Sequence, residues 1–286
     1  MSEKPHAPSE KFKTRVKRNV ADNFDCSYRM YQAFEDRHRF FYTLTLKLAE
    51  NIQLRSNSVV LDVGCGTGIS ARALNERFAC RVLGVDLSEK MVAAGCSLSS
   101  CPDIRLEVGD GECLSELSNG QLFDYVLYNA SIFIMPDADK TFQEAYACLE
   151  TGGKIAYSFY PELEGPGGED LLAVAFDRLG EAMPRYKVVT DYDHAGSALE
   201  NVCGNITHYR WERSLDVEFI RDFFSIPAQS ASLFPGLDYE NRVEKVNALL
   251  ATLGSERDSG KIVWRMAAGM KAKEHSPPLT GGAGGG

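Results

Sequence analysis

The segment from Val59 to Gly68 most constrains what this chain can fold into. It reads VVLDVGCGTG, an apolar run that ends in three closely spaced glycines. A short apolar run bounded by glycine predicts a buried strand. Glycine has no Cβ, so it lets the backbone turn tightly and come close to a bound molecule. Because Ile69–Phe78 has the spacing of an amphipathic helix, the region predicts a strand, a glycine loop and a helix.

A second strand is predicted at residues 81–85, and Asp86 follows it directly. An acidic residue at this point of a βαβ unit can accept hydrogen bonds from the two hydroxyls of a ribose. The third glycine comes one residue too early for the dinucleotide fingerprint, and the chain has no Gly-Lys-Ser/Thr of a triphosphate loop. The pattern therefore indicates a nucleoside-bearing cofactor and speaks against a nicotinamide oxidoreductase.

Further motifs follow in chain order. They are GVDLS at 84–88, GDGE at 109–112, FDYVLYNA at 123–130 and LETGGKI at 149–155. With the glycine loop and Asp62, they resemble the motifs of class I S-adenosylmethionine-dependent methyltransferases. The resemblance is to small-molecule members, in the group of the ubiquinone/menaquinone C-methyltransferases and the malonyl-carrier-protein methyltransferase, and it covers about residues 31–160.

This resemblance implies an α/β fold with a doubly wound, mostly parallel, seven-stranded, Rossmann-like sheet. It also implies a helical lid at the N-terminus and a helical insertion before the last strand. We expect a single methyltransferase domain over 21–270, between a flexible polar tail at 1–20 and a disordered tail at 271–286. Its expected parts are the lid helix at 21–56, the cofactor-binding core at 57–160, substrate-cap elements at 161–258 and the last strand at 259–270.

The resemblance also implies a set of cofactor contacts. Asp62 would pair with the ammonium group of the cofactor, Asp86 would bind the ribose, and Asp110 would accept from the adenine amino group. The lid would contribute a tyrosine, and the residues after the fourth strand would lie beside the transferable methyl. The expected cofactor-binding residues are Tyr31, Asp62, Gly64, Cys65, Gly66, Gly68, Asp86, Leu87, Met91, Asp110, Gly111, Asn129 and Ala130.

A general base cannot be singled out by motif. Histidine is the side chain that titrates near neutral pH without a shifted pKa, so His38, His194 and His208 are the candidates. His194 comes first because it lies in a polar segment expected near the pocket. A thiol, carboxylate or enolate acceptor would need no base.

Composition limits the class of partner. The net charge of −9 speaks against broad binding to nucleic acid, and no stretch of eighteen apolar residues is present to span a membrane. The N-terminus has no signal-peptide pattern, so we expect a cytoplasmic protein whose eight cysteines are free thiols. No metal site is indicated, and the oligomeric state, monomer or homodimer, is left open.

The sequence therefore predicts metal-independent methyl transfer from S-adenosylmethionine to a small-molecule or carrier-bound acceptor, with S-adenosylhomocysteine as product. The fourth motif, Asn129-Ala130-Ser131-Ile132, has no proline pair, which speaks against amino methylation of DNA. Two alternatives remain. One is a protein or RNA methyltransferase, and the other is a non-catalytic protein that binds S-adenosylmethionine or S-adenosylhomocysteine.

Overall fold

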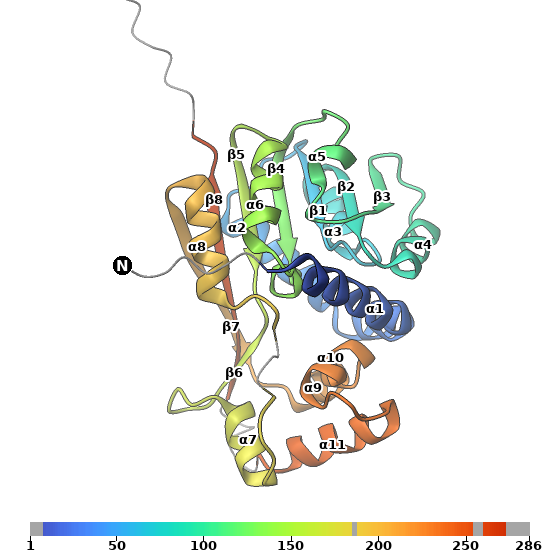
Figure 1. Ribbon diagram of the computed structural model, residues 1–286, viewed down its shortest axis with the longest axis vertical. Helices are drawn as coiled ribbons and strands as arrows, with labels where there is room; N and C mark the ends of the chain where they lie inside the picture. Colours follow the sequence, from blue (N-terminus) through green and yellow to red (C-terminus); the bar gives the residue numbers. More distant parts are fainter. Residues whose placement is uncertain (1–7, 185–187, 254–259, 273–286) are drawn as a thin grey trace, which may run out of the picture.

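The computed structural model describes residues 8–184, 188–253 and 260–272 and shows one mixed α/β sheet (Figure 1). Within these residues the sheet has eight strands in the order β3-β2-β1-β4-β5-β8-β6, and β7 also pairs with β8. The strands are β1 Val59–Val63, β2 Arg81–Asp86, β3 Ile104–Val108, β4 Phe123–Asn129, β5 Leu149–Ser158, β6 Glu162–Glu164, β7 Ile206–Ser214 and β8 Lys261–Met270.

The first five strands of the chain are parallel. Their carboxyl ends therefore lie along one edge of the sheet, where open α/β folds bind ligands. β8 is antiparallel to each of its neighbours, β5, β6 and β7. The expected mixed, mostly parallel sheet is confirmed.

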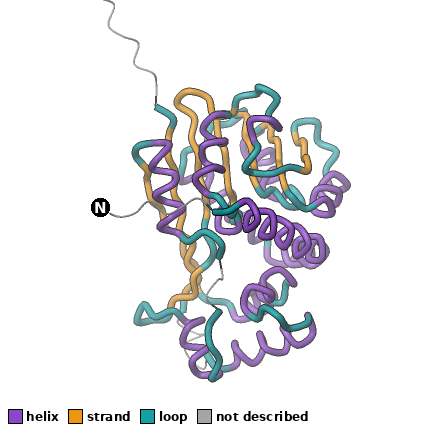
Figure 2. The backbone as a smooth tube through the Cα atoms, in the orientation of Figure 1, coloured by secondary structure: helices purple, strands orange, loops and turns teal. Residues whose placement is uncertain are grey.

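Helices cover both faces of the sheet, with α6 and α8 packed together on one face and α2 and α3 on the other (Figures 1 and 2). A second group, α7, α9, α10 and α11, lies beyond the sheet and is called the cap below. The helices are α1 Glu10–His38, α2 Phe40–Asn51, α3 Ile69–Phe78, α4 Glu89–Leu98, α5 Leu114–Leu117, α6 Ala138–Ala147, α7 Leu171–Leu179, α8 Tyr192–Cys203, α9 Val217–Phe224, α10 Pro227–Leu233 and α11 Tyr239–Ala251, with a 3₁₀ turn at Ile132–Ile134.

The sheet has one strand more than the seven expected. The additional strand, β6, is three residues long and follows β5 after an interruption at Pro161, which has no N–H to donate. β8 is ten residues long, but β5 pairs only with its half from Met266 to Met270. β6 pairs with the other end, Lys261–Val263, and so fills the backbone positions that β5 does not reach.

The N-terminal region also differs from expectation. α1 begins at Glu10, inside the segment predicted to be a flexible tail, because the Ser9 side chain accepts from Phe12 N–H and caps the helix. The predicted single lid helix is two helices, since Arg39 adopts a left-handed conformation (φ 45°) between α1 and α2. Residues 1–7, and 273–286 of the tail expected to be disordered, lie outside the described residues.

A predicted polar loop is instead the first turn of α8. The Asp191 side chain accepts from His194 N–H and caps this helix, while Ala195 and Leu199 are buried one turn apart. The acidic side chains thus mark the start of a helix. The segment was predicted to be a loop because its residues are polar. α10 was also not predicted separately.

The described segments contain neither a membrane-spanning helix nor a metal-binding group of side chains. None of their helices combines the length and apolarity needed to cross a bilayer. None of their His, Cys, Asp and Glu side chains forms a group of three arranged to hold a metal ion. All eight cysteines are free thiols.

The turn between α1 and α2 is fixed by one buried carboxylate. Glu35 accepts from the N–H groups of Phe41 and Tyr42 at 2.9 and 3.0 Å, and so caps α2 from the end of α1. We expect Glu35→Ala to lower the free energy of unfolding by about 1–2 kcal/mol, as loss of a helix cap does. Denaturant titration measures this. Asp36→Ala, on the exposed side of the same turn, is the control, and an equal loss there would contradict the capping role.

Candidate functional site

A pocket lies at the carboxyl ends of β1, β2 and β4 and beneath α1. Its lining joins residues of the glycine loop, the ends of the first strands, α1, α2, the cap and β8. The lining is Lys17, Val20, Phe24, Tyr31, Phe40, Phe41, Val63, Gly64, Cys65, Gly66, Thr67, Ile69, Ser70, Val85, Asp86, Leu87, Met91, Gly109, Asp110, Gly111, Asn129, Ala130, Ser131, Phe133, Ile134, Met135, Pro136, Pro161, Phe223, Gln229 and Trp264.

The structure therefore brings eleven of the thirteen expected cofactor-binding residues into one pocket lining. The two others lie just behind it. Gly68 precedes the first turn of α3 in a left-handed conformation, and Asp62 is buried at the end of β1.

The glycine loop is held in place by backbone hydrogen bonds and by close packing of the Ser131 side chain against Gly64. Gly64 has φ 75°, and a Cβ there would lie 2.4 Å from the Cβ of Ser131. The N–H groups of Gly64 and Cys65 both donate to the carbonyl of Val85, at 2.8 and 3.1 Å. The wall of the pocket at this point is consequently main chain, which a ligand can approach closely.

Asp86 ties the loop to the end of β2. Its Oδ2 accepts from Gly66 N–H and its Oδ1 from Ser88 N–H, both at 2.8 Å. Burial raises the pKa of this carboxyl, although the two backbone hydrogen bonds oppose the rise. Each carboxylate oxygen has a second lone pair, so Asp86 can still accept from a ligand.

Asp62 has an unusual environment. Only 1% of it is exposed, and neither carboxylate oxygen accepts a hydrogen bond from any described residue. Burial, and then the charge of Asp86, raise the pKa of Asp62 to about 7. A buried carboxylate of this kind is stabilised by a cation. Its place directly behind the glycine loop fits the ammonium group of an amino-acid ligand.

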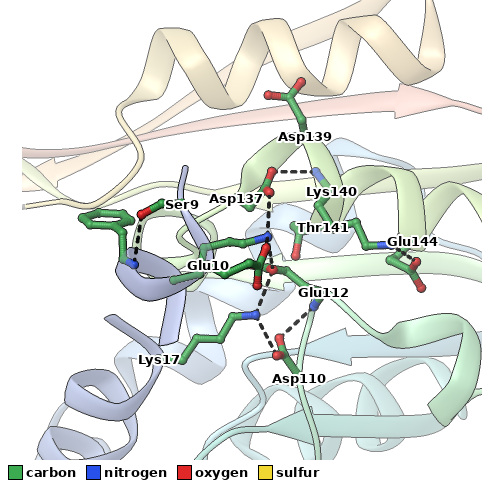
Figure 3. Close-up of polar contacts among 12 residues, drawn as sticks. Ser9, Glu10, Lys17, Asp110, Glu112, Asp137, Asp139, Lys140, Thr141 and Glu144 are labelled. Carbon is green, nitrogen blue, oxygen red and sulfur yellow. Dashed lines mark hydrogen bonds and ion pairs between the residues drawn. The ribbon is translucent and has the colours of Figure 1, made fainter. Parts of the chain in front are cut away.

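At the other side of the loop, α1 is attached to the core by ion pairs (Figure 3). Lys17 lies 2.7 Å from Asp110 and 2.8 Å from Glu112, which is 4% exposed. Lys13 lies 3.4 Å from Asp137 and 3.6 Å from Glu112. Burial lowers the pKa of Lys17, but the hydrogen bonds to the two carboxylates outweigh it and raise the pKa overall. These contacts hold α1 against the residues that follow β3, where Asp110 was expected to meet the adenine.

Asp110 lines the pocket, but its side chain already has partners. Besides Lys17 on Oδ2, Oδ1 accepts from Glu112 N–H at 2.9 Å. Adenine recognition by Asp110 would therefore share the carboxylate with Lys17, and it stays a prediction.

Asn129 has its amide engaged within the protein. Nδ2 donates to Thr45 and Ser70 at 2.8 and 3.1 Å, and Oδ1 accepts from Ser158 at 2.8 Å. These bonds join β4 to β5, α2 and α3. Asn129 thus shapes the pocket wall, while Ala130 follows it at φ 58° and starts the turn after β4.

The candidate histidines do not reach the pocket. His194 lies on α8, 3.2 Å from the carboxylate of Asp139, and the two side chains are 38% and 44% exposed. His38 contacts Asp222 at 2.9 Å, and His208 contacts the hydroxyl of Tyr192 at 2.8 Å. No histidine of the described residues lines the pocket.

Some lining residues had no sequence signal, namely Lys17, Gln229 and Trp264. In the cap, the apolar side chains of Phe219, Phe223, Phe224, Ile226, Leu233, Phe234 and Leu237 could all face a cavity, but of this set Phe223 alone is in the lining. The others pack elsewhere: Phe219, Phe224, Ile226, Leu233 and Phe234 are buried, and Leu237 is 40% exposed.

Comparison with known proteins gives a consistent result. Residues 60–153 match the family described as a methyltransferase domain. Phosphoethanolamine N-methyltransferase 2 of Caenorhabditis elegans is 31% identical over 121 residues, 42% of this chain and 28% of that protein. Trans-aconitate 2-methyltransferase of Deinococcus radiodurans is 35% identical over 103 residues, 36% of this chain and 38% of that protein. The chain thus spans well under half the length of these relatives.

A solved structure extends the likeness of fold. Phosphoethanolamine N-methyltransferase 2 of Haemonchus contortus, in complex with S-adenosyl-L-methionine, superposes with a TM-score of 0.56 at 18% identity. The match covers 87% of this chain and 57% of that one.

The chain contains a class I methyltransferase domain. S-adenosylmethionine is the cofactor of this domain, and the buried carboxylate of Asp62 and the loop held by Asp86 fit its ammonium and ribose groups.

The raised pKa of Asp62 predicts how cofactor binding by the methyltransferase domain depends on pH. A bound ammonium favours the ionised carboxylate, so binding below about pH 7 must first remove its proton. We expect the affinity for S-adenosylmethionine to fall about tenfold per pH unit below this value. Calorimetry between pH 5.5 and 8 measures the affinity and the proton release.

Asp62→Asn is the matched variant, because it keeps the shape and removes the titrating group. We expect weaker binding with little dependence on pH. A wild-type affinity that is flat across this range, or an unchanged dependence in the variant, would contradict an ammonium contact at Asp62.

The ion pairs of Lys17 predict how firmly α1 is held. Replacing Lys17 by Met leaves the buried Glu112 with only the more distant Lys13. We expect α1 to open more readily by about 1–3 kcal/mol, seen as roughly 5- to 150-fold faster hydrogen exchange in its first turns. Lys11→Met, on the exposed side of the same helix, is the control. Equal exchange in Lys17→Met and wild type would show that the ion pairs do not hold α1.

Proposed function

We propose that this protein transfers the methyl group of S-adenosylmethionine to a small-molecule acceptor. The observation that carries the proposal is the buried, unpaired carboxylate of Asp62 behind a glycine loop that Asp86 holds in place. A carboxylate buried this completely is costly unless a cation pairs with it. An amino-acid ammonium joined to a nucleoside supplies the cation and the ribose together.

Each group of the cofactor has a counterpart in the chain. Asp62 pairs with the ammonium, the N–H groups at the start of α3 face its carboxylate, and Asp86 accepts from the ribose hydroxyls. Leu87 and Met91 lie in the lining beside Asp86 and flank the adenine. When bound, the cofactor supplies an electrophilic methyl group on its sulfonium. The residues of the chain align the two reactants and exclude water.

A small acceptor is supported by the way α1 covers the pocket. α1 is bonded to the core through Lys17 and through Asp25, which accepts from the hydroxyl of Ser88. It is bonded to the cap through Ser27, whose hydroxyl accepts from Ala228 N–H at 3.0 Å. A polymer would need an open groove at this place. Two relatives are named as methyltransferases of phosphoethanolamine and of trans-aconitate, and these names also favour a small-molecule acceptor.

The lining places no histidine next to the expected position of the methyl. We therefore propose an acceptor atom that reacts without a histidine base.

The experiment that tests the function has two steps, on protein first freed of any co-purified ligand. Calorimetry with S-adenosylmethionine, S-adenosylhomocysteine and NAD tests the cofactor, and transfer of a labelled methyl to a panel of small acceptors tests the reaction. Binding of NAD alone would overturn the proposal, and binding without any transfer would favour a non-catalytic role.

Asp86→Ala tests the ribose contact. The variant removes the acceptor for the ribose and also the partner of Gly66 N–H. We expect affinity for S-adenosylhomocysteine to fall by about 1–3 kcal/mol, roughly 5- to 150-fold. Asp86→Asn retains one acceptor oxygen and should lose less. Unchanged binding by the alanine variant in a calorimetric titration would show that the ribose lies elsewhere.

A further inference from the structure

The two ends of the pocket differ in charge. One part of the lining, called the cofactor end because it is assigned to the cofactor, includes Asp86, Asp110 and Lys17. Another part of the lining comes from α1, α2, Pro161, the cap and β8, and we call it the acceptor chamber. Tyr31, which was predicted as a cofactor contact, borders both parts, since the charge of Asp86 contributes to its raised pKa. The chamber residues are Tyr31, Phe40, Phe41, Pro161, Phe223, Gln229 and Trp264.

The chamber wall is largely aromatic. The ring of Phe40 lies 5.0 Å from that of Trp264 and 6.1 Å from that of Phe223, while Tyr31 and Phe41 are 5.6 Å apart. Trp264 and Phe40 are fully or almost fully buried. Aromatic faces at these separations offer flat, apolar contact area to a ring or to a hydrocarbon body.

The chamber contains one hydrogen-bonded polar pair. The amide of Gln229 donates to the hydroxyl of Tyr31 at 2.6 Å, although the two residues are 198 positions apart. Both are buried, at 7% exposed. Burial raises the pKa of Tyr31, so its hydroxyl stays neutral. The pair can therefore offer hydrogen bonds but no charge.

The chamber residues include no cationic side chain that could neutralise an anionic acceptor. Lys17 is the one Lys or Arg among the lining residues that the structure describes, and its ammonium is paired with Asp110 and Glu112 at the cofactor end. Burying a phosphate or carboxylate against aromatic side chains without a cation is strongly unfavourable. An uncharged body meets no such cost.

We propose that the acceptor is an uncharged small molecule with an apolar, ring-sized body, oriented by the Tyr31–Gln229 pair. The inference rests on the proposed methyl transfer and narrows its substrate class. Gln229 would then help to determine which acceptors bind, because the side chain at position 229 is one of the polar groups that the chamber offers to the acceptor.

Trp264 supplies a readout that does not depend on activity. The chain has two tryptophans, and Trp211 stacks on Trp264 at 4.7 Å. Trp211→Phe leaves Trp264 as the single reporter in the chamber wall. The probes are 4-methylphenol and 4-methylbenzoate, which share a methylated ring and differ in charge at pH 7. Both are titrated into the variant saturated with S-adenosylhomocysteine, after calorimetry has shown that the variant binds that product like the wild type.

We expect the phenol to change the fluorescence of Trp264 at a concentration at least tenfold lower than the benzoate does. Equal or tighter binding of the benzoate would overturn the inference, and so would the absence of any response to the phenol. Failure to bind S-adenosylhomocysteine would instead count against the proposed function itself. The two failures are therefore distinguishable.

A charge introduced into the chamber tests the same idea in reverse. In the Trp211→Phe background, Gln229→Lys should improve binding of 4-methylbenzoate at least tenfold and weaken binding of the phenol. Leu237→Lys adds the same charge at an exposed position outside the pocket and should change neither. If Gln229→Lys does not fold, Gln229→Leu is the second variant, and it should retain exclusion of the benzoate. Benzoate binding that is equal in the Lys variant and its control would contradict a role for Gln229 in selecting charge.

Discussion

The structure depends on how the glycine loop is fixed between two strands. The carbonyl of Val85 accepts from Gly64 and Cys65, and the carboxylate of Asp86 accepts from Gly66, so the end of β2 sets the path of the loop after β1. Ser131 packs against Gly64 from the turn after β4. Because three strand ends meet in one loop, the path of this loop is determined by the sheet itself. Rigid strands thus supply the positional accuracy that loops alone lack.

α1 then connects this rigid edge to the cap. Its first turns are bonded to the core by Lys17, its middle by Asp25, and its later part reaches α10 through Ser27 and Tyr31. Motion of α1 would therefore change the cofactor end and the acceptor chamber together. This coupling gives a physical reason why access to both ends of the pocket would depend on a single helix.

Local patterns predicted the parts of this structure that rest on local chemistry. β1 and β2 agree with the strands predicted before the glycine loop and before Asp86, because buried apolar runs between turn residues determine them. The patterns failed where partners are distant in sequence. Lys17 meets Asp110 across 93 residues and Gln229 meets Tyr31 across 198, and neither pair leaves a periodic signal. The first part of α1, residues 10–20, was predicted to be a tail for the same reason, since its basic side chains are typical of a solvated segment when their distant acidic partners are not known.

The distribution of charge along the pocket follows from the same arrangement. The acidic groups lie at the ends of β1 and β2 and in the loop after β3, where the proposed cofactor position would bring an ammonium, hydroxyls and an amine to match them. The only lysine in the described lining balances part of this charge and is thereby held at that end. The cap and β8 contribute aromatic side chains instead. On the proposed assignment, one part of this continuous pocket would favour the cationic sulfonium nucleoside and another an uncharged ring, so the two reactants would be distinguished by charge before any reaction occurs.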